Sequence, residues 1–153
     1  MRAAIISSVP KLEVLSKPVC RRLFLPSGIW NEIFDHVDKE CQETIESNNF
    51  RRLFFDSVET HTEMSIVDFL PGKMVRGNID LFIRYKDDRI LILDYKTGGS
   101  KKEILEDPLF YCQQQGFDRQ LSVYKQAISS CFRSKNIETG VWLTKSALFQ
   151  KLS

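Results

Sequence analysis

The sequence predicts an α/β fold in which a mixed β-sheet lies between helices. Three observations support this prediction: a helical apolar stripe within residues 28–47, strand-like segments between residues 58 and 95, and a second helical stripe followed by a strand between residues 118 and 144. With 153 residues, of which 42% are hydrophobic, the chain has enough apolar side chains to form the core of one domain.

The first expected helix covers residues 28–47, with Ser27 as its N-cap. One face of this helix carries apolar residues at helical spacing: Ile29, Trp30, Ile33, Phe34, Val37 and Cys41. Asn48-Asn49 is expected to end the helix, and residues 50–56 to form a short transition. Residues 1–26 contain three prolines, so we expect a partly extended lead-in there and a folded domain over residues 27–153.

Strands are expected at residues 58–70, 74–85 and 89–95. Pro71-Gly72 is a turn signal between the first two, and the polar residues 86–89 join the second and third into a β-hairpin. Residues 90–93 are all aliphatic, which predicts that the last of these strands is buried on both faces. Residues 100–112 are then expected to form a connecting loop or a short helix, followed by a helix over 118–134 and a strand over 138–144.

Charge is distributed unevenly along the chain, although the net charge is only +2. Residues 27–70 carry ten acidic and three basic side chains, whereas residues 118–153 carry six basic and two acidic ones. An enzyme that holds both cations and phosphates could use such regions. Each region taken alone is equally typical of an ordinary solvated surface.

The cysteines and the hydropathy pattern indicate a cytoplasmic protein. Cys20, Cys41, Cys112 and Cys131 are widely scattered and lack the spacing of a zinc site, so we expect reduced, mostly buried thiols. No apolar run approaches the roughly 20 residues needed to span a bilayer, and no membrane association is expected.

Two carboxylates mark one end of the predicted hairpin. Asp80 lies in its first strand, Asp94 follows the four aliphatic residues, and Lys96 should share a strand face with Asp94. A carboxylate at the end of a buried strand is costly unless a cation compensates for it. Asp80, Asp94 and the backbone carbonyl of Tyr95 would suit Mg²⁺, for which Mn²⁺ could substitute. The alternative interpretation is a surface hairpin with an Asp–Lys salt bridge.

Residues 75–81 and 91–98 resemble the core motifs of the PD-(D/E)xK nuclease superfamily in its RecB-like branch, with greatest similarity to the C-terminal nuclease domain of RecB and AddA helicase-nuclease subunits. Residues 117–124 resemble the Gln-x-x-x-Tyr motif of that branch. The resemblance implies a restriction-endonuclease-like α/β/α core. It also implies that Asp80, Asp94 and Lys96 are catalytic and that Gln120 and Tyr124 position DNA. Whether Lys96 acts as a base or as an electrostatic clamp is left open.

The resemblance further implies a metal-site residue on the first helix. Glu32 stands where RecB-like domains usually carry His, and a carboxylate there would still bind Mg²⁺ directly or through water. His36, one helical turn later, is the alternative.

The implied activity is that of a Mg²⁺-dependent deoxyribonuclease, with exonuclease action favoured over endonuclease action. Its implied partners are DNA and, if the chain works within a larger assembly, the helicase subunits of a RecBCD-like or AddAB-like complex. Its implied role is to process DNA ends in recombinational double-strand-break repair. It would act there alone or as the nuclease module of a helicase-nuclease. The alternative is a catalytically silent DNA-binding or assembly module of a repair complex. The cysteine pattern does not match a four-cysteine iron–sulfur cluster, and the chain has no Gly-x-x-x-x-Gly-Lys-Ser/Thr loop, so we expect neither a cluster nor an ATP site.

Overall fold

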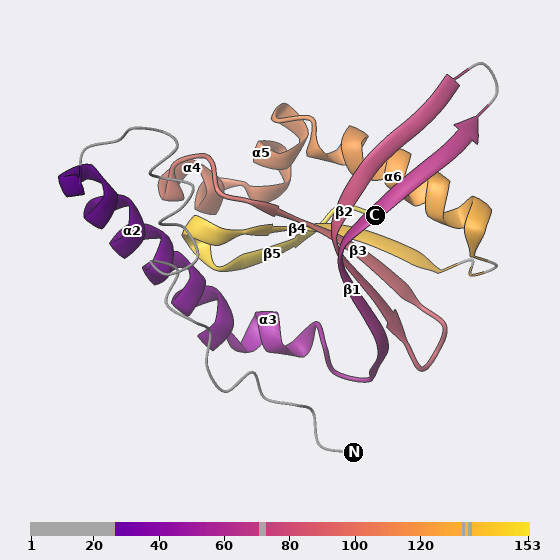
Figure 1. Ribbon diagram of the computed structural model, residues 1–153, viewed down its shortest axis with the longest axis horizontal. Helices are drawn as coiled ribbons and strands as arrows, with labels where there is room; N and C mark the ends of the chain where they lie inside the picture. The colour runs from indigo at the N-terminus through magenta and orange to yellow at the C-terminus, as the bar shows by residue number, and fades with distance from the viewer. Residues whose placement is uncertain (1–26, 71–72, 133, 135) are drawn as a thin grey trace. The chain divides into compact units, whose positions relative to one another are not determined.

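The computed structural model describes residues 27–70, 73–132, 134 and 136–153 (Figure 1). The expected lead-in and the Pro71-Gly72 turn lie outside the described residues. The chain divides into two compact units, Met1–Glu43 and Thr44–Ser153, and each is described by itself below. None of the described helices combines the length and the apolar character that a membrane crossing requires.

Helix α2 spans Ser27–Glu46, which confirms the first predicted helix. The expected transition after it is wrong, since Asn48-Asn49 begins a second helix, α3 (Asn48–Arg52). The Ser47 side chain accepts a hydrogen bond from the backbone N–H of Phe50 and so caps this helix. A helix of five residues has too little periodicity to be predicted from apolar spacing.

Five strands form one mixed sheet in the order β1-β2-β3-β4-β5. Strands β1 (Ser57–Leu70), β2 (Lys73–Tyr85) and β3 (Ile90–Lys96) are successive antiparallel neighbours, as the hairpin pattern predicts. Strand β4 (Ile137–Leu143) runs parallel to β3, and β5 (Leu148–Lys151) runs antiparallel to β4. The sheet and its flanking helices confirm the predicted restriction-endonuclease-like α/β class, although β5 was not expected.

The connection between β3 and β4 is helical. The uncertain stretch 100–112 forms two short helices, α4 (Lys101–Glu106) and α5 (Pro108–Gln114). Their starts are capped by a Ser100–Glu103 capping box and by the Asp107 side chain. Helix α6 (Phe117–Cys131) confirms the predicted second long helix and contacts β1, β2, β3 and β4 on one face of the sheet (Figure 1).

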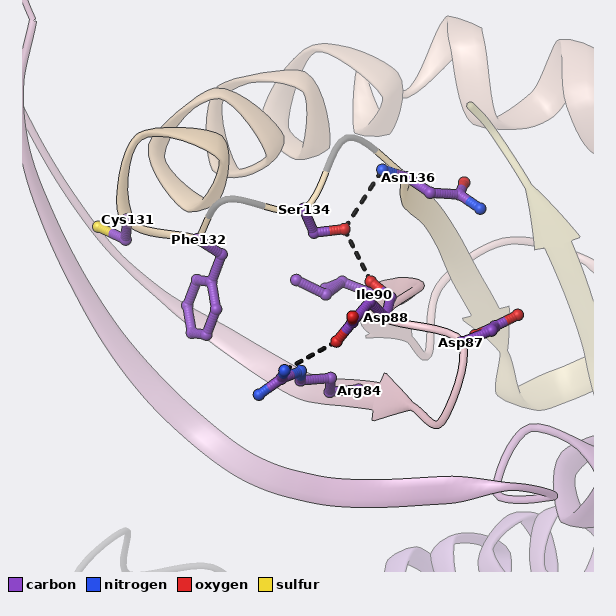
Figure 2. Close-up of a pocket in the computed structure, with 8 residues that line it drawn as sticks. All are labelled: Arg84, Asp87, Asp88, Ile90, Cys131, Phe132, Ser134 and Asn136. Atoms are coloured by element: carbon purple, nitrogen blue, oxygen red, sulfur yellow. Dashed lines mark hydrogen bonds and ion pairs between the residues drawn. The ribbon is translucent and has the colours of Figure 1, made fainter.

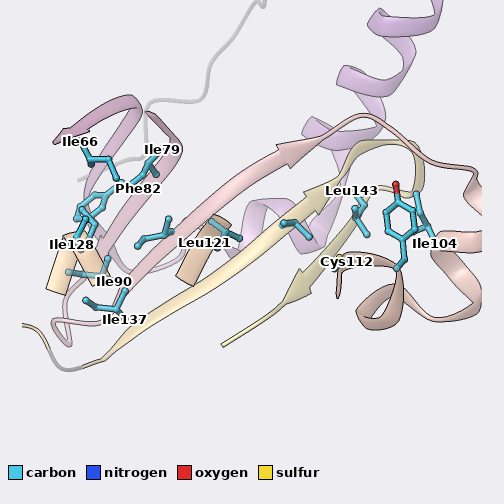
Figure 3. Packing of buried hydrophobic residues seen from close by; sticks show 14 residues of the cluster. Ile66, Ile79, Phe82, Ile90, Ile104, Cys112, Leu121, Ile128, Ile137 and Leu143 are labelled. Carbon is cyan, nitrogen blue, oxygen red and sulfur yellow. The ribbon is translucent and has the colours of Figure 1, made fainter. Parts of the chain in front are cut away.

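Apolar side chains fill both faces of the sheet. On the face covered by α6, β3 contributes Ile90 and Ile92 to a cluster that includes Leu121 and Ile128 of the helix (Figure 3). The opposite face holds a second cluster, to which β3 contributes its remaining aliphatic residues. This cluster includes Trp142, whose Nε1 donates a hydrogen bond to Thr44 at 3.0 Å. The prediction that β3 is buried on both faces is therefore confirmed.

Strand β2 changes the face that it presents to α6 near Asp80. Ile79 belongs to the cluster on the α6 side, whereas Leu81 belongs to the opposite cluster and Phe82 again to the α6 side. In a regular strand, residues two apart share a face. Thr62 pairs with Leu81 and Met64 with Ile79, and Glu63, which lies between them on β1, has a left-handed backbone with φ of 53°. At one end, the paired strands β1 and β2 extend away from the rest of the sheet (Figure 1).

Candidate active site

Asp80 and Asp94 lie at the same end of the β2–β3 pairing. The last paired residues at this end are Leu81 and Leu93, and the two aspartates are the next residues outward on their strands. Oδ2 of Asp80 accepts a hydrogen bond from the backbone N–H of Tyr95 at 2.8 Å. The sheet therefore brings both carboxylates together, because one strand supplies an aspartate and its neighbour supplies the other.

The side chain of Gln120 joins Asp94 to Lys96. Nζ of Lys96 lies 2.6 Å from Oδ2 of Asp94 and donates a hydrogen bond to Oε1 of Gln120 at 3.1 Å. Nε2 of Gln120 donates to Oδ1 of Asp94 and to the Tyr124 hydroxyl, each at 3.3 Å. The amide of one helical residue thus bridges both members of the ion pair from β3.

The Asp94 carboxylate is buried beside a lysine. Its side chain is only 6% exposed, and its Oδ2 lies 2.6 Å from the Lys96 ammonium, with which it forms an ion pair. Burial raises the pKa of Asp94, and the negative charge of Asp80 raises it further, while Lys96 and Gln120 act in the opposite direction. A second cation beside the buried Asp94 carboxylate would therefore stabilise its negative charge.

Tyr95 and Phe117 complete the surroundings of these side chains. The ring of Tyr95 packs on the opposite face of the sheet, and burial, assisted by the charge of Asp80, raises the pKa of its phenol to about 12. Tyr95 therefore offers only its backbone to the site. Sequence reasoning gave no role to Phe117, yet the Lys96 ammonium lies 4.6 Å from the centre of its ring. The available signal was its position three residues before Gln120 on the same helical face.

Glu32 and His36 belong to the other compact unit, on helix α2. The Glu32 side chain is exposed. Nε2 of His36 lies 3.1 Å from Oε1 of Glu40, one turn further along the helix. The role of either residue at a metal stays a prediction.

A pocket of about 490 Å³ lies at the other end of β3 and contains none of the predicted site residues (Figure 2). Arg84 pairs there with Asp88 at 2.8 Å, and the Ser134 hydroxyl donates to the carbonyl of Asp88 at 2.7 Å. Its charged groups therefore already have partners within the protein. The predicted site residues therefore lie at the opposite end of β3, which carries the buried Asp94 carboxylate.

Comparison with known protein families identifies the chain. The model of the PD-(D/E)XK nuclease superfamily matches residues 13–151, nearly the whole sequence. The chain belongs to the PD-(D/E)XK nuclease superfamily. No curated protein matches it. Nucleases of this superfamily typically use divalent metal ions, so the donor set at Asp80 and Asp94 can be compared with what such an ion requires.

The carboxylate pair in this PD-(D/E)XK chain fits a hard divalent cation. Among the described residues, no three His, Cys, Asp or Glu side chains gather into a possible metal site. A structural zinc ion normally has four protein ligands, whereas Mg²⁺ often takes one or two carboxylates and keeps several waters. The Asp94 carboxylate supplies oxygen ligands and already pairs with one cation, the Lys96 ammonium. The residues present therefore suit Mg²⁺ better than zinc.

Gly77→Ala is expected to lower the activity of this nuclease-superfamily chain by about ten- to a hundredfold, because it would displace Tyr124. An added Cβ would lie 2.7 Å from Cε1 and 2.8 Å from the hydroxyl oxygen of Tyr124. The ring would have to move, and its hydroxyl would leave Gln120. Initial rates of DNA cleavage would measure the effect.

A double-mutant cycle separates this contact from general damage to β2. In a Tyr124→Ala background, Gly77→Ala should have little additional effect, since the ring that it displaces is gone. Equal losses in both backgrounds would show that Gly77 acts in some other way.

Proposed function

We propose that this protein is a Mg²⁺-dependent deoxyribonuclease whose reaction centre consists of Asp80, Asp94 and Lys96. The observation that carries the proposal is the buried Asp94 carboxylate, which lies against a lysine ammonium and beside a second aspartate at the end of the central strand. Superfamily membership supports nuclease chemistry, and the order of the sequence motifs supports these residues as its agents.

In the proposed mechanism, Asp80, Asp94 and the carbonyl of Tyr95 would hold the divalent ion. When bound, the ion neutralises phosphoryl charge and makes a water molecule more acidic. Lys96 would hold a phosphoryl oxygen or move a proton beside it. Gln120 fixes the orientation of both Lys96 and Asp94 through its amide, and the Tyr124 hydroxyl accepts from that amide.

Metal-dependent cleavage is the first test. Purified protein should degrade linear DNA in Mg²⁺ or Mn²⁺ and lose this activity in EDTA. Asp94→Ala and Lys96→Ala should also be inactive. Lys86→Ala is the matched lysine control, because Lys86 is exposed in the hairpin turn and pairs with Asp56. Equal cleavage in EDTA, or by Asp94→Ala, would contradict the proposal.

The same preparation tests the alternative of a silent DNA-binding module. A protein that binds DNA with a salt-sensitive affinity but never cleaves it would favour that alternative. The presence of both aspartates and the lysine, with Gln120 bonded to Asp94 and Lys96, favours the enzyme. We further propose exonuclease action on DNA ends in recombinational repair, alone or with helicase subunits. Cleavage of linear DNA but not of closed circles is the expected result.

We propose Glu32 as the helix-borne metal ligand, with His36 as the alternative. The contact of His36 with Glu40 favours Glu32, whose carboxylate is exposed. Glu32→Gln should weaken Mn²⁺ binding and slow cleavage, whereas His36→Gln should change neither. The reverse pattern would transfer the role to His36.

A further inference from the structure

Helix α6 presents three side chains to the site from one stripe. Phe117, Gln120 and Tyr124 are spaced three and four residues apart and therefore lie on the same helical face. Gln120 and Tyr124 belong to the hydrogen-bonded network at Asp94. Phe117 contributes no polar atom, but the face of its ring lies beneath the ammonium of Lys96.

The Lys96 ammonium has three neighbours in the site. It contacts Oδ2 of Asp94 at 2.6 Å, Oε1 of Gln120 at 3.1 Å and the Phe117 ring at 4.6 Å from its centre. An aromatic face attracts a cation through its quadrupole, and more strongly where water is partly excluded. The Lys96 side chain is 21% exposed, so this attraction operates in a mostly desolvated setting.

The ring of Phe117 is held in place by the core. It meets the ring of Tyr111 edge-on, with a centroid separation of 6.2 Å and an interplanar angle of 72°. Tyr111 is 8% exposed and packs tightly on Gly99, where an added Cβ would clash with its hydroxyl oxygen. The partly buried Phe117 ring therefore packs against the core on one side and faces Lys96 on the other.

A divalent cation bound at Asp94 would compete with Lys96 for the same oxygen. Two positive charges at one carboxylate oxygen repel each other, so the ammonium would lose its carboxylate contact when the ion binds. The Gln120 oxygen and the Phe117 ring would then be its remaining partners. Without the ring, a long lysine side chain would readily turn its charge toward water.

We propose that Phe117 is a positioning residue: its ring keeps the Lys96 ammonium beside the reaction centre after a divalent cation has replaced that ammonium at Asp94. This inference rests on the proposed nuclease function. It predicts that an aromatic face, and not merely apolar bulk, is required at position 117.

The direct test is the chemical reactivity of Lys96 in full-length protein. Acetylation by an amine-reactive ester would be followed by peptide mass spectrometry, with and without Ca²⁺ as a divalent probe. In Ca²⁺, Lys96 should react about three- to tenfold faster in Phe117→Leu and Phe117→Met than in wild type or Phe117→Tyr. Lys86 provides the internal standard, because it is exposed in every form.

Several results would overturn the inference. Equal reactivity of Lys96 in wild type and in both aliphatic variants would show that the ring does not hold the ammonium. Phe117→Tyr behaving like Phe117→Leu would show that packing, not the aromatic face, matters. Two aliphatic variants are included because methionine can fill irregular space if leucine disturbs the fold.

Kinetics provide a second readout. The aliphatic variants should lower kcat by about three- to tenfold with little change in KM for DNA, and Phe117→Tyr should restore kcat. A raised KM with unchanged kcat would instead make Phe117 a DNA contact and overturn the inference. Lack of cleavage by wild type would contradict the proposed function, but the acetylation result would still decide whether Phe117 holds Lys96.

Discussion

Asp94→Asn is expected to reduce DNA cleavage to the level measured in EDTA and, in metal-free buffer, to raise the melting temperature. The carboxylate is almost fully buried, and burial raises its pKa despite the nearby Lys96 ammonium. Asparagine has the same shape and removes the buried charge, while its amide oxygen can still accept from Gln120. Thermal unfolding and cleavage assays on the same preparations would measure both effects.

The pH dependence of this stability gain follows from the direction of the pKa shift. The pKa of Asp94 is raised above its ordinary value of 3.8, so the folded protein retains a proton at pH values where the unfolded chain has lost it. That stabilising contribution is complete below the unfolded pKa and is lost as pH rises through the folded pKa. The variant should therefore gain most at neutral pH and little in acid.

Two comparisons make the Asp94→Asn result decisive. Glu106→Gln removes an exposed carboxylate of α4 and should leave both cleavage and stability nearly unchanged. Ca²⁺ should raise the melting temperature of wild type but not of Asp94→Asn, because ligand binding stabilises only a fold that has the site. A variant less stable than wild type at neutral pH would show that the ion pair with Lys96 outweighs the burial cost.

Lys96→Met should also abolish cleavage. Unlike Asp94→Asn, which removes a metal ligand, it should strengthen metal binding. In the structure the Lys96 ammonium occupies the position beside Oδ2 of Asp94 that a divalent cation would take. Methionine keeps much of the length of the side chain and removes the competing charge, so Mn²⁺ and Ca²⁺ should bind more tightly. Calorimetric titration of the metal alone would measure this without any dependence on activity.

The metal-free Lys96→Met protein should be less stable than wild type, because the buried Asp94 charge loses its partner. Added Ca²⁺ should then produce a larger rise in melting temperature than in wild type. Lys86→Met is the control, since its partner Asp56 is exposed and the pair contributes little. Weaker metal binding by Lys96→Met would show that the ammonium does not compete for Asp94.

Local sequence patterns predicted secondary structure correctly where the spacing of the apolar residues stayed the same over a whole strand or helix. Four aliphatic residues in a row predicted a strand buried on both faces, and the two-residue spacing placed Asp94 and Lys96 on one side of it. The four-residue spacing likewise placed Gln120 and Tyr124 on one face of α6, where their side chains do meet.

Short elements were harder to predict because their signals lie in single capping residues. Helices α3 and α4 begin after Ser47 and Ser100, whose side chains accept backbone hydrogen bonds, yet neither helix is long enough to show a periodic apolar face. Strand β5 has four residues and depends on pairing with β4, which is a property of the sheet and not of its own sequence.

The sequence alone determined which chemical groups share an element and a face: Asp94 with Lys96 on β3, and Gln120 with Tyr124 on α6. Only the tertiary structure decided how those faces meet. It placed Asp80 where β2 changes the face that it presents to α6, set Tyr124 against Gly77, and brought Gln120 onto both Asp94 and Lys96. The physical reason is that residue spacing encodes local geometry, whereas the meeting of distant elements depends on how their side chains pack together.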